Sequence, residues 1–365
     1  MSKMEYKDII AFHPGFYINE IIEDMDITQE EFAKRAELTP KHLSDLLHGK
    51  AGITIDVATK LSSMLNTSIE MWFNLQNQYN FQIAEIKKQK NIDEQIRILN
   101  MIDTTFFYKL GLLSSKVSKV ESVSILCNLL KISSLNVLLR PDLSANFRST
   151  SSAQNEKHIV NANAWLETAI TVSKKIEVSE YDSQKLKSYL PEIRSMTLKD
   201  PSVFLPKLKS IFSECGVSFV LLPKMTNAKI NGVVKWLSND KALIAMNDRM
   251  TYADTFWFSL FHEIKHIFQH KTSQVMISYK DMIYELNQHY EDEANKFAGD
   301  YLIQENTLKE YLKTEKITKQ SILSFAKKIG IHPGIVVGRL QNDKVIPYSS
   351  MNELRQKYKI IYQIE

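Results

Sequence analysis

The residues best suited to chemistry lie between Phe256 and His270, FWFSLFHEIKHIFQH, where His262, Glu263 and His266 follow the pattern H-E-x-x-H. On a helix of about 3.6 residues per turn, histidines four positions apart lie on one face, so both imidazoles can bind a single cation. Such a site is tetrahedral and favours zinc. Glu263 points about 100° away from the pair but stays close enough to take a proton from water on the metal. The pattern therefore predicts hydrolytic chemistry.

A second helix, predicted over Tyr290 to Leu302 from its apolar stripe, can supply the third ligand. A carboxylate there would complete a site of two histidines and one acid that leaves the fourth position for water. We favour Glu291 as this ligand, with Asn295 one turn later as its orienting partner. Glu293 stays open as the alternative, because one sequence does not show which rotation of the helix faces the metal.

These two segments, H262-E-I-K-H266 and E291-D-E-A-N-K-F-A298, resemble the ImmA/IrrE family of zinc metallopeptidases. The resemblance implies a gluzincin-like α+β domain, a zinc ion on two histidines and a glutamate, and endopeptidase activity. Members of the family often act on partner transcriptional repressors. Lys265 is a departure, since the family usually has a small residue at this position.

Composition describes a folded, helix-rich protein: of 365 residues 44% are hydrophobic and 24% charged, with 10 glycines and 9 prolines. No apolar run approaches the roughly 18 residues of a membrane helix, and Met1 to Ile10 lacks the order of a signal peptide, so we expect a cytoplasmic protein with no membrane partner. Cys127 and Cys215 lie far apart, which argues against a disulfide framework or a zinc ribbon. A net charge of +4 does not by itself indicate a nucleic-acid partner.

The stretch from Phe12 to Phe81 has the spacing of a helix-turn-helix module. Thr28 opens a capping box for a helix that runs through Ala36. Thr39 caps the next helix, which begins at Pro40 and stops at Gly49. Helix, short turn and helix in this order predict a DNA-binding module whose second helix enters the major groove.

The candidate DNA contacts follow from that placement. They are Thr39, Lys41, His42 and either Ser44 or Asp45 to base edges, with Gln29 and Lys50 to phosphates. Met1 to Lys90 holds 10 Lys and Arg against 13 Asp and Glu, a net of 10 − 13 = −3. Phosphate binding depends on local cations, so tight binding should require a homodimer. A small helical bundle that binds protein alone is the alternative.

The segments I27-T-Q-E-E-F-A-K-R-A-E-L-T-P-K-H-L-S-D-L-L-H-G-K50 and M71-W-F-N-L-Q-N-Q-Y79 are similar to HigA-type antitoxins of the XRE helix-turn-helix class. This resemblance implies a dimeric protein that binds operator DNA and often neutralises a HigB-type ribonuclease toxin. Near the end of the chain, G330-I-H-P-G-I-V-V-G-R-L340 resembles ImmA/IrrE domains fused to HigA-like modules. Asp45 departs from the HigA pattern, which more often has a polar or basic residue there.

The expected fold is α+β and mostly helical: a five-helix helix-turn-helix bundle over residues 1–85, a helical connector over 86–147, and a gluzincin-like zinc peptidase domain over 148–365. The polar segment Arg148 to Lys157 is the expected linker. A small sheet is expected from Val217 to Leu222, Gly232 to Leu237 and Ala242 to Met246. Its edge strand, which we assign to Val233 to Trp236, could hold an extended peptide.

Three classes of function follow. In the first, a DNA-binding regulator and antitoxin carries an active zinc endopeptidase that cleaves a partner protein or repressor, with Glu263 as general base. In the second, the zinc domain is a catalytically silent sensor that binds metal or a partner. In the third, an enzyme uses its N-terminal module to recruit a protein substrate. An active peptidase also needs a donor to the developing oxyanion, and the candidates are Tyr252, His270, His289 and Tyr301.

Overall fold

The computed structural model describes residues 3–140, 156–228, 230, 232–248, 252–273 and 282–359. The chain divides into two compact units, Met1–Arg97 and Ile98–Glu365. It is mostly helical with two small sheets, which confirms the predicted α+β class. Within the described ranges, no helix combines the length and the apolar character that crossing a bilayer requires.

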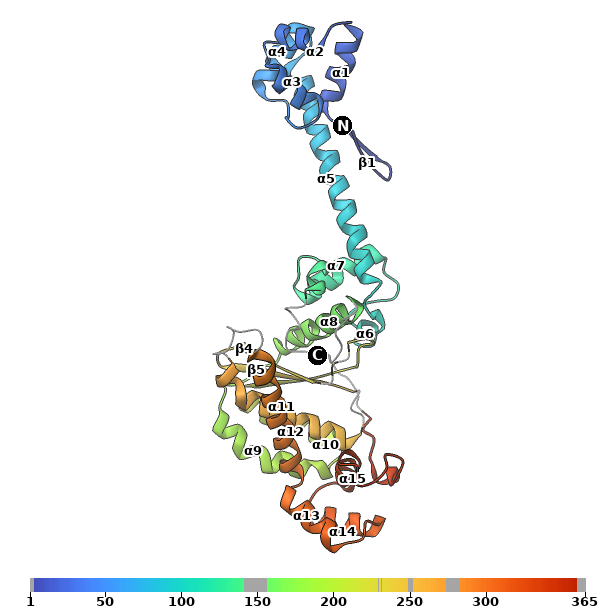
Figure 1. The fold of residues 1–365 in the computed structure, drawn as a ribbon, viewed down its shortest axis with the longest axis vertical. Coiled ribbons are helices and arrows are strands. Elements are labelled where there is room, and N and C mark those ends of the chain that lie inside the picture. The colour runs from blue at the N-terminus through green and yellow to red at the C-terminus, as the bar shows by residue number, and fades with distance from the viewer. Residues whose placement is uncertain are drawn as a thin grey trace. The chain divides into compact units, whose positions relative to one another are not determined.

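The first unit is a bundle of five helices preceded by a β-hairpin that the sequence pattern does not predict (Figure 1). Its elements are β1 (Lys3–Tyr6), β2 (Ile9–Phe12), α1 (Pro14–Asp24), α2 (Gln29–Arg35), α3 (Pro40–Leu47), α4 (Ile55–Leu65) and α5 (Ile69–Leu99). Ile18, Phe32, Leu46, Leu61 and Trp72 are fully buried and form the centre of its core. The five-helix bundle is therefore confirmed, with the hairpin as an addition.

The second unit begins with α6 (Thr104–Lys109), α7 (Lys119–Leu130), the 3₁₀ helix η1 (Leu135–Leu139) and α8 (Glu156–Ser173). Of these, α7 and η1 pack on α8. Two buried asparagines of α8 form hydrogen bonds with the backbone of the preceding residues. Asn161 Oδ1 accepts from the Asp103 backbone N–H at 2.8 Å, and Asn163 Nδ2 donates to the Leu138 carbonyl at 2.9 Å. Of the linker predicted over Arg148 to Lys157, residues 148–155 lie outside the described residues, and Glu156 already belongs to α8.

A three-stranded sheet forms the centre of the second unit. Its strands are β3 (Val217–Leu222), β4 (Gly232–Ser238) and β5 (Lys241–Asn247), in the order β3-β5-β4. β5 runs parallel to β3 and antiparallel to β4. All three strands were predicted nearly to the residue, and the assignment of Val233 to Trp236 to an edge strand is confirmed, because β4 pairs with β5 alone in the described sheet.

Helices cover both faces of this sheet (Figure 1), with α8 on one face and α9 (Ser183–Ser195), α10 (Pro201–Glu214) and α11 (Ala253–Ser273) on the other. The two-residue period of a strand explains the arrangement. Phe219 and Ile244 belong to the core shared with α10 and α11, and the residues next to them in sequence point to the α8 side. α11 therefore packs on an apolar face of the sheet.

The remaining α-helices follow α11 in the chain. They are α12 (Met282–Leu302), α13 (Glu305–Thr314), α14 (Lys319–Ile329) and α15 (Pro333–Asn342). α11 packs against α12 and α15. The segment after α15 returns to α11, where Trp257 Nε1 donates to the Tyr358 hydroxyl at 2.8 Å. Cys127 and Cys215 are not joined by a disulfide, as expected.

Candidate metal centre

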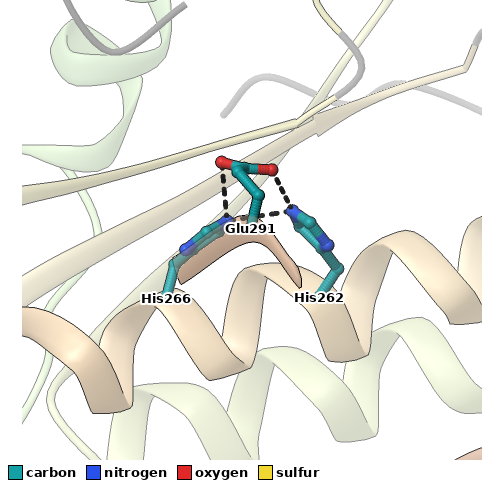
Figure 2. A group of neighbouring side chains, drawn as sticks. All are labelled: His262, His266 and Glu291. Atoms are coloured by element: carbon teal, nitrogen blue, oxygen red, sulfur yellow. Dashed lines mark hydrogen bonds and ion pairs between the residues drawn. The ribbon is translucent and has the colours of Figure 1, made fainter. Parts of the chain in front are cut away.

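Three potential ligands converge from two helices. His262 and His266 project from α11, and Glu291 reaches them from α12 (Figure 2). Glu291 Oε2 lies 3.3 Å from His262 Nε2, and Glu291 Oε1 lies 3.4 Å from His266 Nε2. The two Nε2 atoms are 2.9 Å apart. The helix periodicity predicted the histidine pair, and the rotation of α12 brings Glu291 to it.

The spacing of these atoms fits zinc. Tetrahedral bonds of about 2.0–2.1 Å place neighbouring ligand atoms about 3.3–3.4 Å apart. Each imidazole Nε2 lies at this distance from one oxygen of Glu291, Oε2 for His262 and Oε1 for His266, whereas the two imidazole nitrogens would have to separate by about 0.4 Å. Two imidazoles and one carboxylate are also the donor set of hydrolytic zinc sites. His262, His266 and Glu291 are thus the residues that could hold the metal.

The rest of α11 is apolar, which fixes the direction of the histidine face. Buried side chains cover the opposite side of the helix: Phe256, Trp257, Leu260, Phe261, Ile264 and Ile267. Rotating α11 would expose these groups to water at a cost of roughly 1.5–3 kcal/mol per large side chain. The imidazoles are therefore held in place by packing on the other side of their helix.

Glu263 is 8% exposed and lies beneath the first residue of β4. A β carbon added to Gly232 would stand 2.7 Å from Glu263 Oε1, so the glycine backbone lies directly against the carboxylate. Burial raises the pKa of Glu263 to about 7, with a smaller lowering effect from His262 and a smaller raising effect from Glu291. A carboxyl group with this pKa can accept and return a proton near neutral pH.

His262 experiences opposing effects. Burial lowers its pKa, but the hydrogen bond that the ring donates to Glu291 and the charges of Glu263 and Glu291 outweigh burial, and the pKa is raised. Asn295 also lies beside His262 and raises the pKa further. The buried Nδ1 of His262 has no hydrogen-bond partner among the described residues.

Glu293 faces a different set of partners. Its Oε2 lies 3.2 Å from Lys265 Nζ and accepts from Gln269 Nε2 at 3.1 Å, while its Oε1 lies 3.2 Å from His289 Nε2. Gln269 in turn faces the ligand His266, with 2.9 Å between Oε1 and Nδ1. Sequence reasoning missed Gln269, although its position three residues after His266 on the same helix was a usable signal.

In the first unit, α2 and α3 both have the predicted N-cap residue. Thr28 Oγ1 accepts from the Glu31 backbone N–H, and Thr39 Oγ1 accepts from that of His42, both at 3.2 Å. Glu37 takes a left-handed conformation with φ of 51°, which ends α2 and redirects the chain. The two helices pack on each other through a buried core. This is the geometry of a helix-turn-helix.

Comparison with known proteins finds a family match in each half of the chain. A helix-turn-helix family model matches residues 18–72, and a model described as an IrrE N-terminal-like domain, peptidase M78, matches residues 220–341. The uncharacterized HTH-type transcriptional regulator YddM of Escherichia coli K12 is 36% identical over 86 residues, which are 24% of this chain and 89% of that protein. The chain belongs to the XRE-type helix-turn-helix family. It also carries an IrrE-like peptidase M78 domain.

Solved structures are similar to part of the chain. An addiction module antidote protein of the HigA family from Coxiella burnetii is 30% identical, with a TM-score of 0.21, over 23% of this chain and 91% of that one. A Pseudomonas aeruginosa protein crystallised with its operator DNA is 28% identical, with a TM-score of 0.20, over 20% of this chain and 81% of that one.

The candidate DNA contacts of the XRE-type domain lie on α2, on α3 or directly beside them. Gln29, Thr39, Lys41 and Lys50 are exposed, and His42 and Ser44 are half-buried. Asp45, the alternative to Ser44, is half-buried too, and its carbonyl accepts from the backbone N–H groups of Lys50 and Ala51. Lys41, His42, Ser44 and Asp45 therefore lie on the helix that a helix-turn-helix presents to DNA, and the other candidates lie beside it or on α2.

The oxyanion candidates of the IrrE-like region have other surroundings. The Tyr252 ring contacts the cationic groups of Arg355 and Lys357 at 4.3 and 5.0 Å. Tyr301 follows Glu291 by ten residues, about 15 Å along α12, and stacks on Phe261 at 5.1 Å. His289 pairs with Glu293, as described above. The side chain of His270 lies outside the described residues.

Proposed function

We propose that this protein is a DNA-binding transcriptional regulator of the antitoxin type whose IrrE-like domain is a zinc endopeptidase acting on a partner protein. The observation that carries the proposal is the convergence of His262, His266 and Glu291 beside the buried Glu263. DNA binding is assigned to residues 1–85 and peptidase activity to 148–365, with 86–147 as the helical connector.

His262, His266 and Glu291 would hold the zinc ion. When bound, zinc in such a site polarises the scissile carbonyl and makes water a better nucleophile. Glu263 would act as general base, because burial brings its pKa to about 7 and leaves it able to take and release a proton. Among the described residues β4 pairs with β5 alone, and its other edge begins at Gly232, next to Glu263, so a peptide added to this edge would pass the site in extended form.

A catalytically silent zinc sensor is the second candidate, and one specific observation favours it. Tyr252, His289 and Tyr301, the described candidates for an oxyanion donor, contact Arg355, Glu293 and Phe261 respectively. Peptidases normally direct such a donor at the reacting carbonyl. A silent domain would bind zinc or a partner and transmit that state to the DNA-binding domain.

The two candidates differ in one experiment. Zinc-loaded wild type and Glu263→Gln are incubated with each protein encoded next to its gene, and products are followed by mass spectrometry. We expect new fragments of one neighbour with wild type and at least a 100-fold slower appearance, on the order of a lost general base, with Glu263→Gln. Equal fragments from both proteins would indicate a contaminating protease, and no fragments with any neighbour would favour the silent sensor.

For the XRE-type domain, we propose that α3 enters the major groove of operator DNA and that a homodimer binds two half-sites. A HigB-type toxin is the proposed protein partner. Lys41→Ala should weaken binding to the DNA upstream of the gene by about 5- to 20-fold, measured by fluorescence anisotropy at fixed salt. Full affinity in this variant would contradict the assignment of α3.

A further inference from the structure

Gln269 is 7% exposed and joins three groups around the candidate metal centre. Its Nε2 donates to the Tyr290 carbonyl at 3.0 Å and to Glu293 Oε2 at 3.1 Å. A carbonyl and a carboxylate can only accept, so the amide nitrogen must be on this side. The amide oxygen therefore faces His266, with 2.9 Å between Oε1 and Nδ1.

This orientation determines which nitrogen of His266 carries hydrogen. An amide oxygen accepts and does not donate, so Nδ1 must be the protonated nitrogen of the ring. The lone pair of a neutral His266 is then on Nε2, the atom that lies 3.4 Å from Glu291 Oε1. That tautomer is the one a ligand needs in order to bind a cation through Nε2.

Glu293 is anchored in turn by charge. Lys265 Nζ lies 3.2 Å from Oε2, the same oxygen that accepts from Gln269, and His289 Nε2 lies 3.2 Å from Oε1. Lys265 is one quarter exposed and the Glu293 side chain 40% exposed, so the pair is partly shielded from water. A connected row of four side chains therefore leads from Lys265 through Glu293 and Gln269 to His266.

We propose that Gln269 is a positioning residue for the metal site, held in its orientation by Glu293 and Lys265. The inference rests on the proposed zinc site. It gives the two glutamates of α12 separate roles, with Glu291 as ligand and Glu293 as anchor of the amide. It also gives a role to Lys265, whose positive charge holds the anchoring carboxylate in place.

The test is the zinc affinity of the full-length protein, measured by competition with a chromogenic chelator. Gln269→Leu keeps the size of the side chain and removes its hydrogen bonds. We expect its affinity to fall by about 10- to 100-fold, the usual effect of removing a group that orients a ligand. Gln288→Leu is the matched control, because exposed Gln288 bonds Asp292 one turn further on, and it should stay within about twofold of wild type.

An exchange variant separates positioning from a general structural role. Gln269→Glu alone places two carboxylates side by side and should weaken zinc binding. In the double variant Gln269→Glu/Glu293→Gln, the carboxylate at position 269 accepts from His266, and the amide at position 293 donates to that carboxylate. Most of the lost zinc affinity should therefore return. If Gln269→Leu does not fold, this pair of variants carries the test.

The tautomer is a second, independent readout. Nitrogen chemical shifts of His266 in metal-free protein should show hydrogen on Nδ1 in wild type and a mixture in Gln269→Leu. Wild-type affinity in Gln269→Leu, or no recovery in the exchange variant, would overturn the positioning role and leave the metal site intact. A wild type that binds no zinc at all would remove the proposed site itself, and with it any ligand for Gln269 to position.

Discussion

Arg194 offers a quantitative test of how the helix that carries Glu291 is held. This half-buried residue of α9 donates to three carbonyls at 2.9 Å each: Tyr301 and Leu302 at the end of α12, and Ile329 at the end of α14. The last carbonyls of a helix lack partners within it, and a cation is favourable at this end of the helix dipole. Arg194 therefore closes two helix ends at once.

The expected loss can be worked from these contacts. A hydrogen bond that involves a charged group contributes about 1.5–3 kcal/mol, so three of them give roughly 4.5–9 kcal/mol before costs. Burial of the guanidinium opposes part of this gain, as its lowered pKa shows, and the three hydrogen bonds are only partly buried, so water can replace part of them in a variant. For Arg194→Met, which keeps the apolar stem, we expect a net loss of about 3 kcal/mol. In a unit of this size the loss corresponds to roughly 6–12 °C in Tm.

Urea unfolding followed by hydrogen exchange of peptides from α12 and α14 measures the stability of the second unit separately. Arg194→Lys is the matched variant, because it keeps the charge but cannot direct three donors at three carbonyls. We expect Arg194→Lys to lower the free energy of unfolding by more than half of the loss in Arg194→Met. A change below about 0.5 kcal/mol in Arg194→Met, the level of an ordinary surface substitution, would refute the reasoning.

Three further predictions follow from single positions. Glu37→Gly should stabilise the first unit by roughly 0.5 kcal/mol in urea unfolding, because glycine takes the left-handed φ of 51° without strain; destabilisation would contradict this. Gly232→Ala should keep zinc content but reduce any proteolysis by about tenfold or more, since its β carbon would displace the Glu263 carboxylate; unchanged cleavage would show that this contact is dispensable. Burial raises the pKa of Tyr358 to about 12, whereas the same hydroxyl in the unfolded chain ionises from about pH 10. The free energy of unfolding should therefore fall by up to roughly 3 kcal/mol between pH 10 and 12. Tyr358→Phe should lack that part of the slope, and an identical slope in both proteins would contradict the assignment.

The parts of the structure that sequence alone predicts are those decided by local periodicity. The histidine pair follows from a four-residue spacing on a helix, and the caps at Thr28 and Thr39 follow from hydroxyl groups placed before helical runs. β3 and β5 follow from short apolar runs between polar residues. Each of these depends on neighbours within a few residues.

Other features depend on contacts distant in sequence. Glu291 and Glu293 lie on one helix but have different surroundings. Glu293 contacts Lys265 and Gln269, which both lie on α11. The β1–β2 hairpin has no Asn-Gly or similar turn signal. It is instead tied to α5 by Lys7, which lies 2.6 Å from Asp93. No pattern within ten residues contains this information.

The selection between the two glutamates is the most direct point at which to test the account. Purified protein is saturated with zinc, freed of excess metal, and analysed for zinc per chain in wild type, His262→Ala, Glu291→Gln and Glu293→Gln. The account predicts one zinc ion per chain in wild type and in Glu293→Gln, and loss of the metal in the other two. A wild type without stoichiometric zinc, or a His262→Ala variant that retains it, would contradict the central claim that these side chains of α11 and α12 form one metal site.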